Sequence, residues 1–415
     1  MTDPVISPDG KWMWTGSEWI PAPPTSALIA DSTINLEDSM VSGNVNLEQS
    51  SSDASSVINL KDSAMSGDIN ITQNNAEDIA TAMVQALERM GFSGQSSPAE
   101  LTPSQEKEVE QVLEISEQMT SQGIEIDPWI EITLGNAAKH ALRIRSADRH
   151  FFRALEQFRH IGDRKGEATS LRKLADNISR IERNVAEAGR LMRQSLAITR
   201  EIGDRQGEAS SLNKLGSYAI HIDNDEAERL IRQSLEISIE IGDRREEADS
   251  LNNLALIPHF QGDFAQAERY WSEALAIHKE IGNRHGEIVS LGNLGAVAVD
   301  DRGDYAEAER YWRAALAVER EIGNRLGEGL TLFNLGVAAD NQGDVDEAEH
   351  LFRESLAIYR QSGERLEVAR GLFKIAEIAY KNGNMDERHR CLTEAVRIHR
   401  ELEIPIHQWY IDNGY

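Results

Sequence analysis

The residue types that carry out catalysis and bind metal ions are present in this chain, but their spacing suits neither task. The 11 histidines are scattered, and the pair His150 and His160 is ten residues apart, which is unlike the spacing of two metal ligands on one helix. The single cysteine, Cys391, stands beside Leu392 at a position where packing is expected. No phosphate-binding glycine loop, Gly-x-Ser-x-Gly elbow or His-Glu-x-x-His helix occurs. The sequence therefore predicts a protein that is not an enzyme and that holds no cofactor or metal ion.

The net negative charge of the chain argues against nucleic acids and anionic membranes as partners. Its 415 residues include 43 Lys or Arg against 70 Asp or Glu, a net charge of −27. Nucleic acids and anionic membranes both need clustered positive charge, so neither is an expected partner. One cysteine excludes an internal disulfide framework, and no apolar stretch approaches the ~20 residues of a membrane span. The N-terminus also lacks the apolar core of a signal peptide, so we expect a soluble, cytoplasmic protein.

The acidity is concentrated at the front of the chain. Residues 1–126 hold four Lys or Arg against 20 Asp or Glu, together with most of the Ser, Asn and Gly clusters. Residues after 127 have the composition of continuous helix, and Asp127-Pro128 is a helix-start signal. We therefore predict a domain boundary near residue 127, with the main domain over 127–415.

A tripeptide, Gly-Asp/Asn-Arg, recurs through that main domain. Its steps are 41, 39, 40, 41 and 40 residues, the last reaching a Gly-Glu-Arg variant, and it begins at Gly162, Gly203, Gly242, Gly282, Gly323 and Gly363. Glycine can take the left-handed conformation that ends a helix, and the Asp or Asn after it can cap the next helix. The tripeptide therefore predicts the junction between successive repeat units.

Each repeat unit reads as two amphipathic helices. The first contains Leu-x-x-Leu/Ile-Gly/Ala, as at Leu291-Leu294-Gly295, which places these residues on one face of a helix. In the second, a small residue is followed four positions on by a bulky one, as at Ala308 and Trp312. Small and bulky residues that alternate on one face are what close helix packing requires.

These features resemble the tetratricopeptide repeat family in a long form of ~40 residues per repeat. The resemblance covers residues 128–402 as seven helix pairs, and LGVAADNQGDVDEAEHLFRES at 335–355 carries the family's pattern most fully. It implies a mostly α-helical protein, a right-handed α–α superhelical solenoid, in which each pair is stabilised by stacking on its neighbours.

In the family, the first helices line a concave groove that binds a partner peptide or helix. The resemblance places the groove residues within the two x positions of Leu-x-x-Leu, and the partner-binding residues implied here are Arg172, Lys173, Asn213, Lys214, Asn252, Asn253, Asn293, Phe333, Asn334, Phe373 and Lys374. An Asn amide offers a donor and an acceptor to a peptide backbone, while Lys and Arg favour carboxylates. A structural role, in which the Asn satisfies neighbouring backbone, is the alternative. The Arg of each tripeptide has two interpretations as well: a basic stripe along the groove, or a structural pair with a Glu such as Glu167 or Glu208.

The front third contains a second, shorter repeat. STINLEDSMVSGNVNL and SVINLKDSAMSGDINI align at a step of 24 residues within a segment that we assign to residues 27–75. Their period-two alternation predicts short strands, as small β-hairpins or as two rungs of a β-layer, and their edges suggest self-association, with disorder as the alternative. Residues 1–26 hold Trp12, Trp14 and Trp19 before a Pro-rich spacer, and are similar to short Trp-rich hairpin modules.

Residues 76–126 are expected to form linker helices, over 76–91 and 104–120. The chain as a whole is then predicted to be a non-catalytic scaffold for protein–protein interaction, whose groove grips a segment of another protein. The alternative is a signalling sensor whose solenoid closes on a small peptide.

Overall fold

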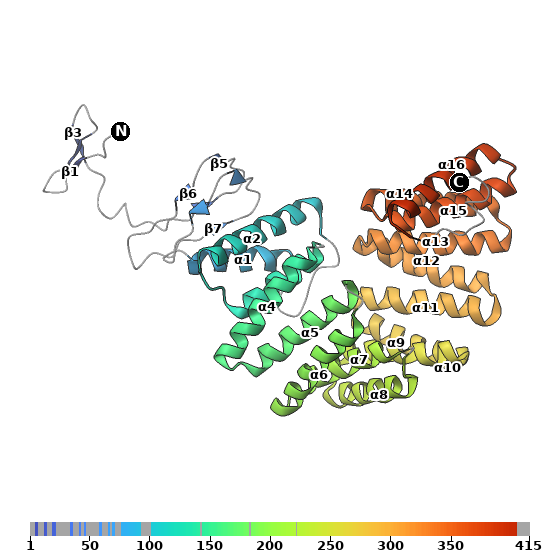
Figure 1. Ribbon diagram of the computed structural model, residues 1–415, viewed down its shortest axis with the longest axis horizontal. Helices are drawn as coiled ribbons and strands as arrows, with labels where there is room; N and C mark the ends of the chain where they lie inside the picture. Colours follow the sequence, from blue (N-terminus) through green and yellow to red (C-terminus); the bar gives the residue numbers. More distant parts are fainter. Residues whose placement is uncertain are drawn as a thin grey trace. The chain divides into compact units, whose positions relative to one another are not determined.

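The computed structural model describes residues 76–92, 101–141, 143–181, 184–220 and 222–404, together with short strands between residues 5 and 70. The chain forms two compact units, residues 1–161 and 162–415. The first unit contains the strands and helices α1 to α4, and the second contains helices α5 to α16 (Figure 1). The predicted boundary at residue 127 remains a prediction.

The first three strands pair antiparallel in the order β1-β2-β3: β1 Val5–Ile6, β2 Trp12–Trp14 and β3 Trp19–Pro21. The other six pair in parallel between the two 24-residue copies: β4 Ile34–Asn35 with β7 Ile58–Asn59, β5 Val41–Ser42 with β8 Met65–Ser66, and β6 Val45–Asn46 with β9 Ile69–Asn70. A hairpin joins antiparallel strands, so the parallel pairing does not support hairpins over residues 27–75. The side chains there lie outside the described residues, and self-association through them stays a prediction.

The helical part of the first unit is α1 (Ala76–Arg89), α2 (Pro103–Ser121), α3 (Pro128–His140) and α4 (Ile144–Ile161). Apolar side chains of α1 and α2 are fully buried, among them Met83, Leu87, Val109 and Val112. Ion pairs also tie α2 to α4, for example Arg149 to Glu117 at 3.0 Å. The segment predicted as linker helices is therefore packed into a compact unit.

Glu131 fills the place in α3 where the other first helices carry a leucine. Its side chain is only 1% exposed, and its Oε2 lies 2.5 Å from Nδ1 of His150 while its Oε1 accepts a hydrogen bond from Arg153 at 2.9 Å. A buried carboxylate is costly unless it is paired, and both partners come from α4. A polar cluster thus joins α3 to α4 where apolar contact would be expected.

The second unit is a series of six helix pairs. The first and second helices of each pair are α5 (Arg164–Ile181) and α6 (Val185–Ile202), α7 (Arg205–Ala219) and α8 (Asn224–Ile241), α9 (Arg244–Gln261) and α10 (Phe264–Glu280), α11 (Arg284–Arg302) and α12 (Tyr305–Ile322), α13 (Arg325–Gln342) and α14 (Val345–Ser362), and α15 (Arg365–Lys381) and α16 (Met385–Glu401). Together with α3 and α4, they confirm the seven predicted helix pairs.

The repeated tripeptide forms the junctions as predicted. Gly242 ends α8 with φ of 71°, in the left-handed region, and Asp243 then accepts a hydrogen bond from the Glu246 backbone N–H at 3.1 Å at the start of α9. The Gly-Glu-Arg tripeptide that begins at Gly363 differs from the others, because the side chain of Glu364 makes no such capping hydrogen bond to α15.

The alternation of small and bulky residues forms the contact within each pair. A Cβ atom on Gly295 of α11 would lie 2.3 Å from Nε1 of Trp312 in α12, and one on Gly336 of α13 would lie 2.7 Å from the Phe352 ring in α14. Only glycine leaves room for these rings, so the two helices of a pair approach closely at this point.

The Arg of the tripeptide connects the two helices of its own pair. Arg244 at the start of α9 contacts Glu247 on the same helix at 2.7 Å and Glu280 at the end of α10 at 2.8 Å. Arg164, Arg205 and Arg284 make the same two contacts in their pairs. The structural interpretation therefore holds for these arginines, and because their ion pairs are exposed to solvent they add little to stability.

Candidate functional site

The first helices of successive pairs contact one another along one face of the second unit. Lys214 of α7 lies 3.9 Å from Asp176 of α5, and Lys381 of α15 forms an ion pair with Asp340 of α13. We call the surface that these first helices form together the first-helix face. It contains the second x residue of each Leu-x-x-Leu motif: Lys173, Lys214, Asn253, Asn293, Asn334 and Lys374.

The two x positions of the motif differ in exposure. The second x residues are all partly or fully exposed. The first x residues lie deeper: Asn213, Asn252 and Phe333 are buried, while Arg172 and Phe373 are partly buried. Neighbouring positions on a helix point about 100° apart, so only one of the two can face solvent fully.

Asn252 is held by internal contacts. Its side chain lies 3.0 Å from Nε2 of His278 and accepts a hydrogen bond from Ser290 at 2.9 Å, and its backbone carbonyl accepts one from Trp271 at 3.2 Å. The structural alternative fits this residue. Phe333 is similar, because its ring packs 5.4 Å from that of Phe352.

The α7–α9 part of the first-helix face is polar. The Asn213 amide accepts a hydrogen bond from Asn253 at 2.9 Å and donates one to Glu246 at 2.8 Å, so the three side chains form a chain across two helices. Burial raises the pKa of Glu246 to about 7, although the bond from Asn213 acts in the opposite direction. This carboxyl therefore keeps its proton to a higher pH than an ordinary glutamate does.

Two cations stand at the α5–α7 end. Asp176 raises the pKa of Lys214, which stays charged. Burial lowers the pKa of the Arg172 guanidinium, against the attraction of Asp204, and its Nη1 is buried with no hydrogen-bond partner among the described residues. This end of the face therefore combines both signs of charge.

The α11–α13 part of the face is more apolar. Val289 and Leu330 are 45% and 47% exposed, and each lies one helical turn before an Asn of the series, Asn293 or Asn334. Neither Asn makes a hydrogen bond to any residue that the structure describes. Each of these two first helices thus carries one exposed apolar side chain one turn before a part-exposed amide.

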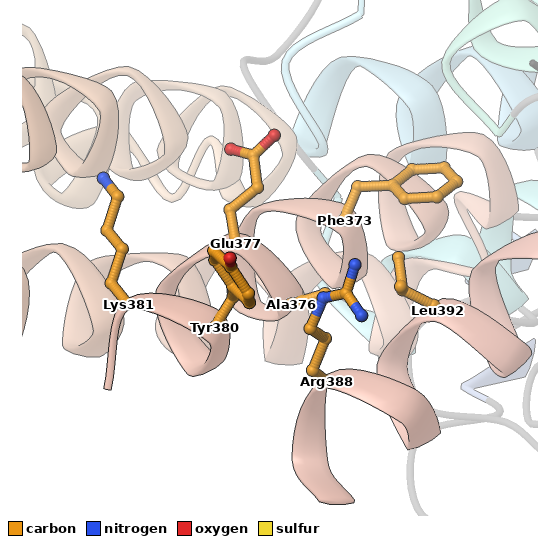
Figure 2. A pocket seen from close by; sticks show the side chains of 7 residues that line it. All are labelled: Phe373, Ala376, Glu377, Tyr380, Lys381, Arg388 and Leu392. Atoms are coloured by element: carbon orange, nitrogen blue, oxygen red, sulfur yellow. The ribbon is translucent and has the colours of Figure 1, made fainter. Parts of the chain in front are cut away.

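The α15 end of the face adds a small pocket. Lys374 pairs with Glu377 at 2.8 Å on the same helix. Figure 2 shows the pocket of about 300 Å³ between α15 and α16, lined by Phe373, Ala376, Glu377, Tyr380, Lys381, Arg388 and Leu392. The Arg388 guanidinium lies over the Tyr380 ring at 5.2 Å, a cation–π contact.

Several residues of this face are not among the binding residues predicted from the sequence. Glu246 and Asp249 lie seven and four positions before Asn253, and Val289 and Leu330 lie four positions before their Asn. Such spacings place residues on the same side of a helix, so a helical projection from each Asn would have identified them.

Among the described residues, no group of three or more His, Cys, Asp or Glu side chains is placed to hold a metal ion. Within the same residues, none of the helices combines the length and the hydropathy that crossing a bilayer requires.

Comparison with known proteins agrees with this architecture. A family model described as "Tetratricopeptide repeat" matches residues 223–280, 246–301 and 300–361. No curated protein sequence matches the chain significantly.

Solved structures with a similar fold share little sequence identity with the chain. A Rap protein complexed with Competence and Sporulation Factor matches with a TM-score of 0.54 and 14% identity, over 80% of this chain and 89% of that one. The signal transduction ATPase with numerous domains from Pyrococcus horikoshii, which has a tetratricopeptide repeat sensor, matches with a TM-score of 0.52 and 18% identity, over 80% of this chain and 53% of that one. The apo form of RapI matches with a TM-score of 0.50 and 13% identity, over 79% of this chain and 88% of that one. These likenesses show the fold.

Proposed function

We propose that this chain, whose residues 223–361 match the tetratricopeptide repeat model, is a non-catalytic interaction scaffold that binds a segment of a partner protein along the first-helix face. Repeats of this architecture offer extended surfaces for binding other chains. The partner segment lies across the first helices and contacts Asn253, Asn293 and Asn334.

The observation that carries this proposal is that the amides of Asn293 and Asn334, beside exposed Val289 and Leu330, hydrogen-bond to none of the described residues. An amide side chain can donate to and accept from the backbone of a bound segment at once. Apolar side chains beside it can bury the segment's own apolar residues. A structural Asn has its hydrogen bonds filled within the chain, as Asn252 does.

Selection from a displayed random-peptide library tests the proposal. Peptides that bind the full wild-type chain are retested on a variant with Asn293→Ala and Asn334→Ala. We expect a loss of at least about tenfold in affinity, because two hydrogen-bonding groups are removed. Thermal stability should not change, since neither amide has a hydrogen bond to lose within the part of the chain that the structure describes.

The matched control replaces two exposed amides on second helices, Gln194→Ala and Gln361→Ala. This variant should bind the selected peptides as the wild type does. If it loses the peptides equally, or if the Asn variant keeps them, the first-helix face is not the binding surface. If the Asn variant is destabilised while binding survives, the two amides are structural.

A second candidate function is a sensor whose solenoid closes on a small peptide. The fold likeness to a Rap protein solved with Competence and Sporulation Factor, and to an ATPase with a tetratricopeptide repeat sensor, favours it. Small-angle scattering of the chain with and without a selected peptide separates the two functions. A sensor should shorten its maximum dimension on binding, whereas a rigid scaffold should keep it.

A further inference from the structure

Glu319 is a buried carboxyl at the contact between α12 and α13. Its side chain is only 2% exposed, and its Oε1 accepts a hydrogen bond from Thr331 of α13 at 3.1 Å. Its Oε2 is buried and has no hydrogen-bond partner among the described residues. The packing is tight, because a Cβ atom on Gly327 would lie 2.7 Å from Oε1.

Among the described residues, no cation forms an ion pair with Glu319. On α13 it faces Glu328, which repels it, and the nearby Arg320 of α12 and Arg325 of α13 both bind Glu328 instead. On α14 it faces Tyr359, whose pKa burial raises to about 12, so that group stays neutral. An ionised Glu319 would accept a hydrogen bond from only the Thr331 hydroxyl and would be repelled by the negative charge of Glu328.

The matching positions in the other pairs are not carboxyls. At steps of 39 to 41 residues they are Thr199, Ser238, His278 and Tyr359. Thr199 and Ser238 donate their hydroxyl protons to carbonyls of their own helices, at 3.0 and 2.8 Å. The carboxyl is therefore specific to the α12–α13 contact.

We propose that Glu319 is a pH-sensitive switch at this contact, which the neutral acid keeps closed and the carboxylate loosens. The physical reason is that a buried, unpaired charge is unfavourable, whereas opening the contact lets water solvate it. Burial raises the pKa of Glu319 to about 7, so the folded protein keeps a proton that an opened segment would release.

The sign of the effect follows from that difference. The closed contact is favoured fully below pH ~4.5, and this advantage is lost as the pH rises toward 7. The switch is a property of α12 and α13 and does not require the first-helix face to bind anything. It does act on α13, which carries Leu330 and Asn334 of that face.

Hydrogen exchange on the full chain tests the switch, with rates corrected for the intrinsic effect of pH. Between pH 5.5 and 8.5, local opening of the segment 311–331 in the wild type should increase by up to about 30-fold. Glu319→Gln can still accept from Thr331 but cannot ionise, so its opening should not depend on pH. Glu319→Thr, which installs the residue of the α6 position, guards against misfolding of the first variant and should give the same result.

Glu236→Gln is the control, because Glu236 is an exposed carboxyl on α8. It should keep the wild-type pH dependence at residues 311–331. The switch is refuted if opening of this segment in the wild type does not change with pH. It is equally refuted if the dependence persists in both Glu319 variants.

Discussion

The indole of Trp312 occupies the space that a side chain at Gly295 would fill, and its Nε1 donates a hydrogen bond to the Gly292 carbonyl at 3.1 Å. The ring belongs to α12, whereas the glycine that leaves room for it and the carbonyl that accepts its hydrogen bond both belong to α11, the other helix of the same pair. This contact fixes the separation and rotation of α11 against α12, and it gives the first prediction.

Gly295→Ala should destabilise the chain by about 1–3 kcal/mol, because the new methyl group forces the Trp312 ring out of its site. The measurement is the urea midpoint of unfolding, with Trp fluorescence as the probe. Gly292→Ala is the matched control on the same helix, since no atom lies within 4 Å of its Cβ position. It should be neutral or stabilising by about 0.5–1 kcal/mol. Equal effects of the two substitutions would contradict the packing argument.

Glu364→Asp should stabilise the start of α15. The shorter carboxylate can accept from the backbone N–H three residues on, as Asp243 does for α9, whereas Glu364 makes no capping bond. A new cap contributes about 1 kcal/mol, which hydrogen exchange of the first turn of α15 would detect as slower exchange. Glu364→Gln gains no capping hydrogen bond, so the first turn of α15 should exchange in this variant as fast as in the wild type.

Glu403→Gly should also be stabilising. Glu403 follows α16 with φ of 55°, in the left-handed region that glycine occupies at the matching junctions. Relief of this conformation is expected to contribute about 1 kcal/mol, seen as a higher melting temperature. The reverse test is Gly363→Ala, where φ is 74° and the Cβ position is empty, so any loss of stability comes from the backbone alone. A stabilising Gly363→Ala would be inconsistent with this account.

The pH dependence of stability should have a component from Glu246. Its pKa is raised to about 7, so the folded chain holds a proton that the unfolded chain releases, and stability falls as the pH rises from 4.5 toward 7. Glu246→Gln keeps an acceptor for Asn213 and should remove about 1–2 kcal/mol of this fall, a value reduced for partial exposure of the carboxyl. Denaturant unfolding at pH 4.5 and pH 8 measures it. An unchanged fall in the variant would remove Glu246 as its source.

Local sequence chemistry was sufficient to predict the helix pairs and their junctions. Gly242 and Asp243 act within a few residues of themselves, so their types alone indicate a left-handed helix end followed by a cap. The pairing of Trp312 with a small residue opposite also follows from a regular spacing on two neighbouring helices. These features depend on backbone geometry and not on distant parts of the chain.

The assignment of exposed positions was harder to predict. Asn252 and Asn253 are identical in type and adjacent, yet one is enclosed by His278 and Ser290 while the other lies on the first-helix face. Which of the two faces solvent depends on the rotation between successive pairs, and no local signal encodes that rotation. The buried Glu131 is a similar case, because its partners on α4 are known only once α3 and α4 are packed.

The sequence could not decide how the strands over residues 34–70 pair, because the local pattern does not depend on which strand lies beside which. The 24-residue repeat indicates two equivalent copies, but alternation of apolar and polar residues is the same in a hairpin and in a parallel stack. The observed partners, such as Ile34 with Ile58, are equivalent residues of the two copies.

The close contacts between a glycine and a bulky side chain also bear on how such a chain can grow. Gly216 with Ile231, Gly295 with Trp312 and Gly336 with Phe352 each lie inside a single pair, so a duplicated pair brings its own matching shape with it. Between pairs, the contact at Ser234 and Ser250 involves small hydroxyl side chains, whose shapes are easily exchanged. Gene duplication can therefore copy a whole pair with its internal packing already matched.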